Sequence, residues 1–199
     1  MFSLIQKPAP DFSTDAVMPN GEFQKVTLSS FKDKKYVVAF FYPLDFTFVC
    51  PSEIISFSNH AHEFENRNVQ LLGISVDSKF SHHAWRKTPV EQGGIGEIKF
   101  PLVSDLTKEI SRDYGVLVDD AIALRGTFLI DKSGIVRHAT LNDLPLGRSV
   151  AETLRMVDAL QHTEAHGEVC PAGWRKGDAA MKPSAGGVAS FLKEHAAKL

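Results

Sequence analysis

The sequence predicts an α/β fold with a central mixed β-sheet flanked by helices and an extended C-terminal tail. Two largely apolar runs, at residues 36–42 and 69–77, are typical of strands that are covered on both faces. A helical pattern separates them, which predicts parallel strands joined by a right-handed crossover. Beyond residue 165 glycine and proline crowd the chain, so we expect a folded domain at residues 1–165 and a tail at residues 166–199.

Composition and charge limit the partners of the protein. The 199 residues carry a formal net charge of −2 at pH 7, which gives no reason to expect nucleic acid or an anionic membrane as a partner. No apolar run approaches the length of a membrane span. The first five residues lead at once into Gln6, Lys7 and two prolines, so no signal-peptide core is expected. We therefore expect a cytoplasmic enzyme.

The N-terminal residues predict short elements that lead into the central strand. Residues 8–12 contain two prolines and are expected to be extended, and a turn at 19–21 leads into a strand at 23–28. Residues 29–34 are typical of a single helical or irregular turn. The central strand at 36–42 then ends at Pro43, because proline cannot donate to a strand ladder.

Helices are expected on either side of the second strand. A helix follows Cys50, because apolar residues recur there at steps of three and four, at Ile54, Phe57, Ala61 and Phe64. A second helix is expected at residues 81–87, followed by a glycine-rich loop at 93–96. No lysine followed by serine or threonine closes this loop, so a phosphate-binding loop is not expected.

The C-terminal half predicts the remaining elements of the sheet. A strand is expected at 99–103, a helix at 105–114 and a loop at 117–123. Residues 127–131 and 135–140 flank Lys132-Ser133-Gly134, which predicts a hairpin. An amphipathic helix follows Ser149, with apolar residues at Val150, Leu154, Val157 and Leu160. A short helical piece at 188–197 ends the tail.

Cys50 is the first candidate for chemistry, because the pattern places it at or near the start of a helix. Unpaired backbone N–H groups and the positive end of the helix dipole gather there, and both favour a thiolate over a thiol. Thr47, three positions earlier, offers a hydroxyl to the sulfur or to a bound oxygen. The alternative is a buried structural cysteine behind an N-cap threonine.

The second cysteine, Cys170, lies in the glycine-rich tail. Two cysteines are too few for a secreted disulfide framework, and their spacing is not that of a Cys-x-x-Cys pair. If the two cysteines pair at all, we expect a transient, catalytic bond.

The run Phe-Tyr-Pro-Leu-Asp-Phe-Thr-Phe-Val-Cys-Pro that ends at Pro51 resembles the active-site motif of the typical two-cysteine peroxiredoxins. The likeness continues in Ala84-Trp85, in the glycine loop at 93–96, in Arg125-Gly126-Thr127-Phe128 and in Val169-Cys170-Pro171-Ala172-Gly173-Trp174. It therefore covers nearly the whole chain, and it implies a thioredoxin-like fold and a thiol peroxidase.

The resemblance also implies a role for each site residue. Cys50 would be the peroxidatic cysteine, in a pocket completed by Pro43, Thr47 and Arg125, and Cys170 the resolving cysteine that pairs with Cys50 of another subunit. The substrate would be a hydroperoxide and the reductant thioredoxin or a dedicated flavoprotein. No cofactor or metal is implied. A homodimer is required, which in this family often assembles into a decameric ring.

Glu53 and Arg125 each have a second interpretation. Glu53 either holds Arg125 through a charge-assisted hydrogen bond or is an acid favoured in the first helical turn. Without context, an arginine at a strand entrance is a solvated charge, whereas beside a thiolate Arg125 would act as a counter-charge.

Two other functions compete with the peroxidase. His162, His166 and Cys170 fall at steps of four, but no set of residues offers four ligands at zinc spacing. The other alternative is a chaperone-like protein whose function is the ring itself.

In sensitive members of the family a terminal Tyr-Phe pair covers the active-site helix and promotes over-oxidation; here Phe191-Leu192 stands in its place, so we expect intermediate sensitivity.

Overall fold

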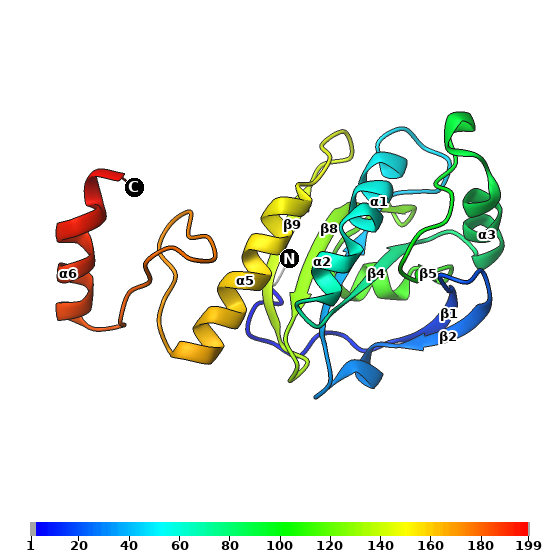
Figure 1. Ribbon diagram of the computed structural model, residues 1–199. Coiled ribbons are helices and arrows are strands. Elements are labelled where there is room, and N and C mark those ends of the chain that lie inside the picture. The colour runs from blue at the N-terminus through cyan, green and yellow to red at the C-terminus, as the bar shows by residue number, and fades with distance from the viewer. Residues whose placement is uncertain (1–2, 199) are drawn as a thin grey trace. The chain divides into compact units, whose positions relative to one another are not determined.

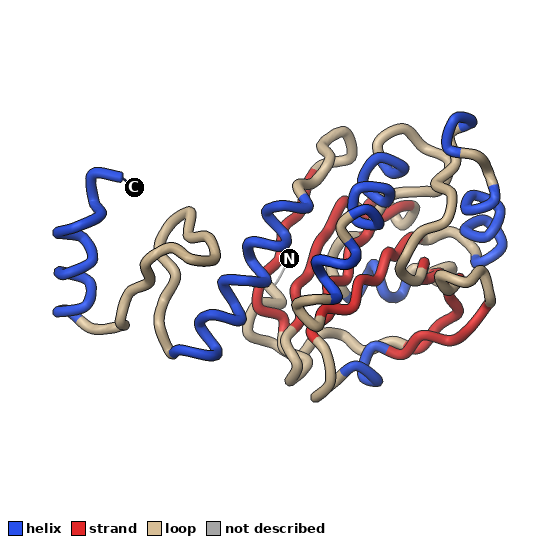
Figure 2. The backbone as a smooth tube through the Cα atoms, viewed as in Figure 1, coloured by secondary structure: helices blue, strands red, loops and turns tan. Residues whose placement is uncertain are grey.

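A seven-stranded mixed sheet forms the centre of the structure, a computed structural model that describes residues 3–198 of the chain. The strands of this sheet are β1 Ser13–Val17, β2 Phe23–Thr27, β3 Tyr36–Phe41, β4 Val69–Ser75, β5 Leu102–Ser104, β8 Arg125–Ile130 and β9 Val136–Asn142. They lie in the order β2-β1-β5-β4-β3-β8-β9, and Figure 2 shows the strands in red.

The strand directions confirm the predicted mixed sheet. β3 pairs in parallel with β4, and β4 in parallel with β5. β8 runs antiparallel to both β3 and β9, as expected for the hairpin. The central position of β3 explains its sequence, because each of its six residues is buried and a strand covered on both faces has no need for polar alternation. The result is a thioredoxin-like α/β fold.

Helices cover one face of this sheet (Figure 1). They are α1 Cys50–Asn59, α2 Ala61–Glu65 and α3 Lys79–Lys87, and the 3₁₀ turns η1 Leu28–Phe31 and η2 Val90–Gln92 lie in the connections. Phe57 of α1 stacks on Phe40 of β3 with ring centroids 4.3 Å apart, and Phe100 meets Phe40 edge-on. Burying these rings fixes α1 over the strand that precedes it.

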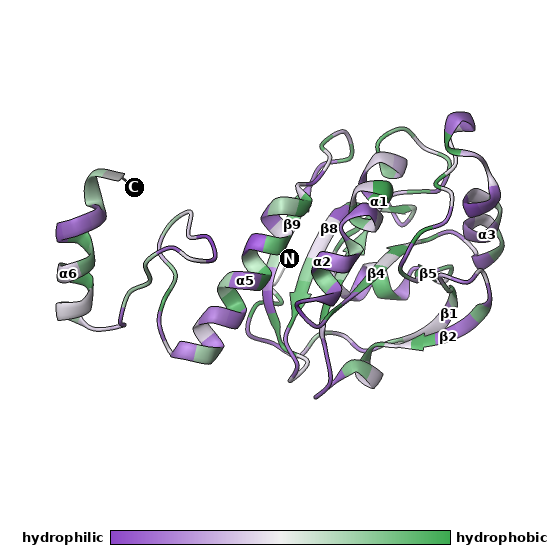
Figure 3. Ribbon diagram, viewed as in Figure 1, coloured by the Kyte–Doolittle hydropathy of each residue, from purple (hydrophilic) through white to green (hydrophobic). Residues whose placement is uncertain are grey.

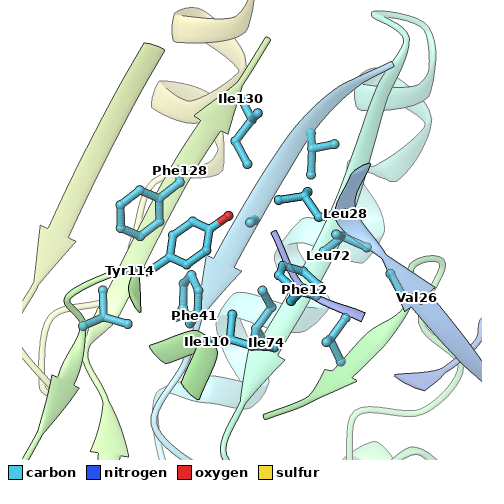
Figure 4. Close-up of a cluster of buried hydrophobic side chains, with 14 of the residues drawn as sticks. Phe12, Val26, Leu28, Phe41, Leu72, Ile74, Ile110, Tyr114, Phe128 and Ile130 are labelled. Atoms are coloured by element: carbon cyan, nitrogen blue, oxygen red, sulfur yellow. The ribbon is translucent and has the colours of Figure 1, made fainter. Parts of the chain in front are cut away.

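The opposite face of the sheet buries a second cluster of apolar side chains, shown in Figure 4. Phe41 packs against Tyr114 at 5.1 Å and against Phe128 at 5.7 Å between ring centroids. Because side chains alternate along β3, Phe40 and Phe41 serve opposite layers. In Figure 3 helix α3 is largely purple because most of its residues are hydrophilic, although Trp85 on the same helix is fully buried and Phe80 is 66% exposed.

Several expected elements differ from those observed. Residues 13–17, which were not predicted as a strand, form β1 between β2 and β5. Residues 117–123 form a small ribbon of β6 Leu117–Val118 and β7 Ile122–Ala123 instead of a loop. The strand expected at 99–103 is β5, Leu102–Ser104.

Two predicted helices are shorter than expected. The helix after Cys50 is interrupted at His60, between α1 and α2. The helix expected at 105–114 is α4, Glu109–Asp113, and the carboxylate of Asp105 accepts the backbone N–H groups of Ile110 and Ser111 at 3.1 and 2.7 Å. The Asp105 carboxylate thus accepts the N–H groups at the start of α4, which have no carbonyl partner in a preceding helical turn.

The chain divides into two compact units, Met1–Arg148 and Ser149–Leu199. The second unit contains α5 Val150–His166, α6 Ala185–His195 and the turn η3 Ala196–Lys198. The Ser149 hydroxyl accepts the N–H of Glu152, as expected for an N-cap, and Gly167 ends α5 with a φ of +66°. None of the helices in the described residues has the length and hydrophobicity that a bilayer crossing requires.

Candidate active site

The loop between β3 and α1 brings Cys50 to the first position of α1. Val49 is the N-cap residue, and Pro51, which has no N–H to leave unpaired, follows within the first turn. The side chain of Cys50 is fully buried. Cys50 thus lies at the helix start, as predicted, and its burial limits the solvent screening of the helix dipole at the sulfur.

The hydroxyl of Thr47 lies beside this sulfur. Its Oγ1 is 2.9 Å from Sγ of Cys50 and 2.8 Å from the carbonyl oxygen of Leu44. A hydroxyl has one hydrogen, so Thr47 donates to only one of these acceptors at a time. Thr47 is not the N-cap of α1, which removes the alternative interpretation of this residue.

Arg125, the first residue of β8, supplies a cation to the same sulfur. Its Nη1 is 3.3 Å from Sγ of Cys50 and 2.7 Å from Oε2 of Glu53, and its Nε donates to the carbonyl of Leu144 at 2.7 Å. The residue is 3% exposed, so it is not a solvated strand-end charge. Three acceptors around one planar guanidinium fix its orientation toward Cys50.

Glu53 is held by a second arginine that the sequence did not reveal. Arg148 donates from its backbone N and from Nε to Oε1 of Glu53, at 2.9 and 2.8 Å, and from Nη2 to Oε2 at 2.9 Å. Its Nη1 also reaches the carbonyls of Phe41 and Gly126, at 2.7 and 2.9 Å. The carboxylate therefore bridges two guanidinium groups, one of which contacts the sulfur.

The protonation of Glu53 follows from these contacts. Burial by itself would raise the pKa of Glu53, but hydrogen bonds and charge from Arg148, with charge from Arg125, outweigh it and hold the pKa below its ordinary value. Glu53 is 4% exposed and is ionised at neutral pH. The interpretation of Glu53 as a mere helix-start acid does not account for this clamp.

Pro43 is buried at the start of the loop that carries Thr47. Between them, Asp45 is anchored on both its main chain and its side chain. Its N–H donates to Oδ2 of Asp77 at 2.9 Å, and its carboxylate lies 2.9 Å from Nδ1 of the fully buried His82. The loop is therefore fixed by polar contacts as well as by packing.

Cys170 lies in the other unit, on the segment that follows α5. Its Sγ is 3.6 Å from the carbonyl oxygen of Ala159 and 3.7 Å from Oγ1 of Thr163. Both cysteines are free thiols. Trp174, four residues further on, is buried and accepts a hydrogen bond from Nη1 of Arg155 at its carbonyl, at 3.0 Å.

The histidines near Cys170 make other contacts. Nε2 of His162 lies 3.1 Å from Oε2 of Glu168, and its ring stacks on that of His166 with centroids 4.4 Å apart. In the part of the chain that the structure describes, no group of three or more His, Cys, Asp or Glu side chains could hold a metal ion.

A buried cysteine at a helix start, flanked by a threonine hydroxyl and a fixed arginine, matches the site that the sequence predicts, and comparison with known proteins decides the family. The model of the AhpC/TSA family matches residues 5–139. The chain belongs to this family of peroxiredoxins. The model of the C-terminal domain of 1-Cys peroxiredoxin matches residues 159–194 of this peroxiredoxin.

Individual relatives of this peroxiredoxin align over almost the full chain. Alkyl hydroperoxide reductase C of Helicobacter pylori strain J99 is 57% identical over 197 residues, 98% of this chain and 100% of the relative. Peroxiredoxin-1 of Gallus gallus is 58% identical over 182 residues, 91% of each chain. The crystal structure of the reduced Plasmodium vivax 2-Cys peroxiredoxin matches with a TM-score of 0.96 at 55% identity and covers 96% of this chain and 100% of that chain. The protein is thus an enzyme of the thiol-peroxidase class.

Proposed function

We propose that Cys50 is the peroxidatic cysteine and that its thiolate attacks one oxygen of a hydroperoxide. The sulfur–oxygen bond forms as the O–O bond breaks, so the cysteine is oxidised to a sulfenic acid and the second oxygen leaves as water or an alcohol. The observation that carries this proposal is the position of the Cys50 sulfur, at the start of α1 with Thr47 and Arg125 within 2.9 and 3.3 Å.

The surrounding side chains have separate roles in this step. Thr47 orients the peroxide, since its hydroxyl can turn from the Leu44 carbonyl toward a bound oxygen. Arg125 stabilises the negative charge that develops on the leaving oxygen. Pro43 shields the pocket from water, and Glu53 keeps Arg125 in place because its carboxylate is itself clamped by Arg148.

Cys170 completes the cycle as the resolving cysteine. Its thiol attacks the sulfenic sulfur of Cys50 in another subunit, which forms an intersubunit disulfide and releases water. Thioredoxin or a dedicated flavoprotein then reduces the disulfide by thiol exchange. The proposed cycle needs no metal, haem or flavin bound to this chain.

The assembly and its place in the cell are also proposals. The intersubunit disulfide requires at least a homodimer, and we propose that dimers close into a decameric ring in the cytoplasm, with residues 166–199 acting as the mobile arm. A solved Plasmodium yoelii relative that is modified at its N-terminus forms an artifactual octamer. Assembly is therefore best measured on a chain with an unmodified N-terminus.

Two serine variants test the roles of the cysteines. Cys50→Ser should abolish peroxide reduction, whereas Cys170→Ser should still consume one equivalent of peroxide quickly and stop at the sulfenic acid. Stopped-flow measurement of peroxide consumption distinguishes these outcomes. If the Cys170 variant lacks even the first turnover, the two roles are wrongly assigned.

The state of the oxidised protein tests the pairing. Oxidised wild-type protein should migrate as a disulfide-linked dimer on a non-reducing gel and as a monomer after reduction. A fast-moving oxidised monomer would instead indicate a bond within one chain.

A further inference from the structure

The loop that carries Thr47 contains a backbone conformation that it would not adopt unaided. Phe46 has a φ of +55°, in the left-handed region that an aromatic side chain rarely occupies. Such a conformation costs roughly 1–2 kcal/mol for a residue other than glycine. Contacts elsewhere must therefore hold Phe46, and Thr47 directly after it, in place.

Asp77 provides such a contact from the neighbouring strand. It follows β4, which pairs with β3, and its Oδ2 accepts the backbone N–H of Asp45 at 2.9 Å. Asp45 immediately precedes Phe46. The hydrogen bond thus fixes the main chain at the residue before the left-handed turn, two residues from Thr47.

Asp77 is itself held in place by contacts outside the loop. The hydroxyl of Ser75 donates to the same Oδ2 at 2.7 Å, and Ser75 Oγ accepts the N–H of Asp77 at 3.2 Å. Ser104 of β5 donates to the Asp77 carbonyl at 2.7 Å. The position of the carboxylate is therefore determined by the ends of two strands, which are more rigid than the loop.

We propose that Asp77 is a positioning residue for the peroxidase reaction, which holds the Asp45 N–H and thereby places the Thr47 hydroxyl beside the sulfur of Cys50. The proposal rests on the roles of Cys50 and Thr47 proposed above. Asp77 touches neither the sulfur nor the peroxide. Its effect should therefore appear only in a reaction that needs the Thr47 hydroxyl.

The chemical nature of the residue fits this role. Partial burial, followed by the charge of Asp45, raises the pKa of Asp77, while the hydrogen bonds from Ser75 and the Asp45 N–H act in the opposite direction. Burying a carboxylate costs free energy. The two donors that converge on Asp77, the Ser75 hydroxyl and the Asp45 N–H, both need an acceptor, and an ionised carboxylate offers only acceptors.

The test compares two reactions of one sulfur. In a Cys170→Ser background Cys50 is the only thiol, so its rates with hydrogen peroxide and with iodoacetamide can be measured side by side. Asp77→Leu, which removes both acceptors, should slow the peroxide reaction at least tenfold and change the iodoacetamide rate less than twofold. Asp77→Asn, which keeps an oxygen for the Asp45 N–H, should stay within about threefold of the parent in both.

Asp105→Leu is the matched control. Asp105 is a buried carboxylate at the end of β5 that also accepts two hydrogen bonds, but from the backbone of α4 and not from the Thr47 loop. This variant should lose stability without losing peroxide rate. If Asp77→Leu fails to fold, Ser75→Ala replaces it, since removing one donor should slow the peroxide reaction about threefold with the iodoacetamide rate preserved.

A double-mutant cycle with Thr47→Val tests the role of Asp77 separately from the proposed role of Thr47, on which it rests. If Asp77 acts through Thr47, then Asp77→Leu should slow the Thr47→Val enzyme less than twofold further. Equal losses of the peroxide and iodoacetamide rates, or an unchanged peroxide rate in Asp77→Leu while Thr47→Val is slow, would overturn the role of Asp77 alone. An unaffected Thr47→Val enzyme would overturn the proposed role of Thr47, and the inference with it.

Discussion

Glu53 and Arg148 form a two-point ion pair in which Nε and Nη2 of the arginine meet opposite oxygens of the carboxylate, at 2.8 and 2.9 Å. Both side chains are almost completely buried, at 3% and 4% exposure. Glu53 also binds Arg125, the arginine that faces the sulfur. Because Arg148 is hydrogen-bonded to the strand carbonyls of Phe41 and Gly126, the pair fixes Arg125 relative to the sheet. The two arginines and Glu53 therefore act as one unit.

Removing Arg148 should destabilise the protein strongly. Breaking a buried ion pair by deleting one partner leaves the other poorly compensated, so Arg148→Ala should lower the free energy of unfolding by about 3 kcal/mol. Urea denaturation measures this. Arg112→Ala is the control, because its pair with Asp120 is exposed, at 54% and 85%, and is worth no more than about 0.5 kcal/mol. Equal losses in the two variants would contradict the clamp.

Removing Arg125 should slow the first chemical step. Arg125→Ala loses both the counter-charge beside the sulfur and the donors to the leaving oxygen, so the peroxide rate constant should fall at least tenfold. Arg125→Lys should recover only part of the rate, because an ammonium cannot reproduce the planar fork. Unchanged values would leave Arg125 a structural residue.

The lowered pKa of Glu53 predicts how its contribution to stability varies with pH. A carboxylate whose pKa is lower in the folded state stabilises the protein above its unfolded pKa of about 4.5, and this contribution is lost as the pH falls through the folded value. The stability difference between wild type and Glu53→Gln should therefore be largest above pH 5 and narrow as the pH falls below about 4. Denaturation curves across this range measure it, and a difference independent of pH would contradict the lowered pKa.

The tail should influence over-oxidation. Phe191 is 8% exposed, and its ring lies 4.6 Å from that of His195, so it is packed within the C-terminal unit. Phe191→Tyr adds a hydroxyl whose hydrogen bond would be worth about 1 kcal/mol, roughly fivefold in an opening equilibrium, so the enzyme should inactivate at lower peroxide. Deletion from Val188 onward should make it more resistant.

Mass spectrometry of the Cys50 sulfinic acid after turnover measures this effect. Leu192→Tyr is the matched control, because Leu192 is 42% exposed and a hydroxyl there meets water. The sulfenic acid of Cys50 either reacts with Cys170 or is oxidised further by a second peroxide. Equal sulfinic acid fractions in Phe191→Tyr, the deletion and wild type would show that the tail does not control which of these two reactions occurs.

Local patterns predicted most of the sheet and the core of the site. The apolar run of β3, the period of α1 and the glycine of the β8–β9 hairpin are signals within one segment. β3 and the hairpin formed where expected, and α1 began where expected but ended earlier, at His60. β1 escaped prediction because its sequence Ser-Thr-Asp-Ala-Val has little strand character, and its pairing with β2 and β5 decides its conformation.

Arg148 escaped prediction for a related reason. Its partner Glu53 is 95 residues away, and a single arginine before a helix cap carries no periodic signal. The peroxiredoxin resemblance includes Arg125 because this arginine belongs to the Arg125-Gly126-Thr127-Phe128 motif, whereas the local pattern alone favours a solvated charge. Contacts between distant segments are thus the part of the site that one sequence does not reveal.

The complete burial of Cys50 has a practical consequence for anyone who counts thiols in this protein. A bulky aromatic disulfide reagent cannot reach a sulfur enclosed beneath the first turn of a helix, whereas Cys170 is partly exposed. An assay of the native, reduced enzyme with such a reagent will therefore report one equivalent promptly and the second only after denaturation. One prompt equivalent is therefore the result expected of the reduced, folded enzyme.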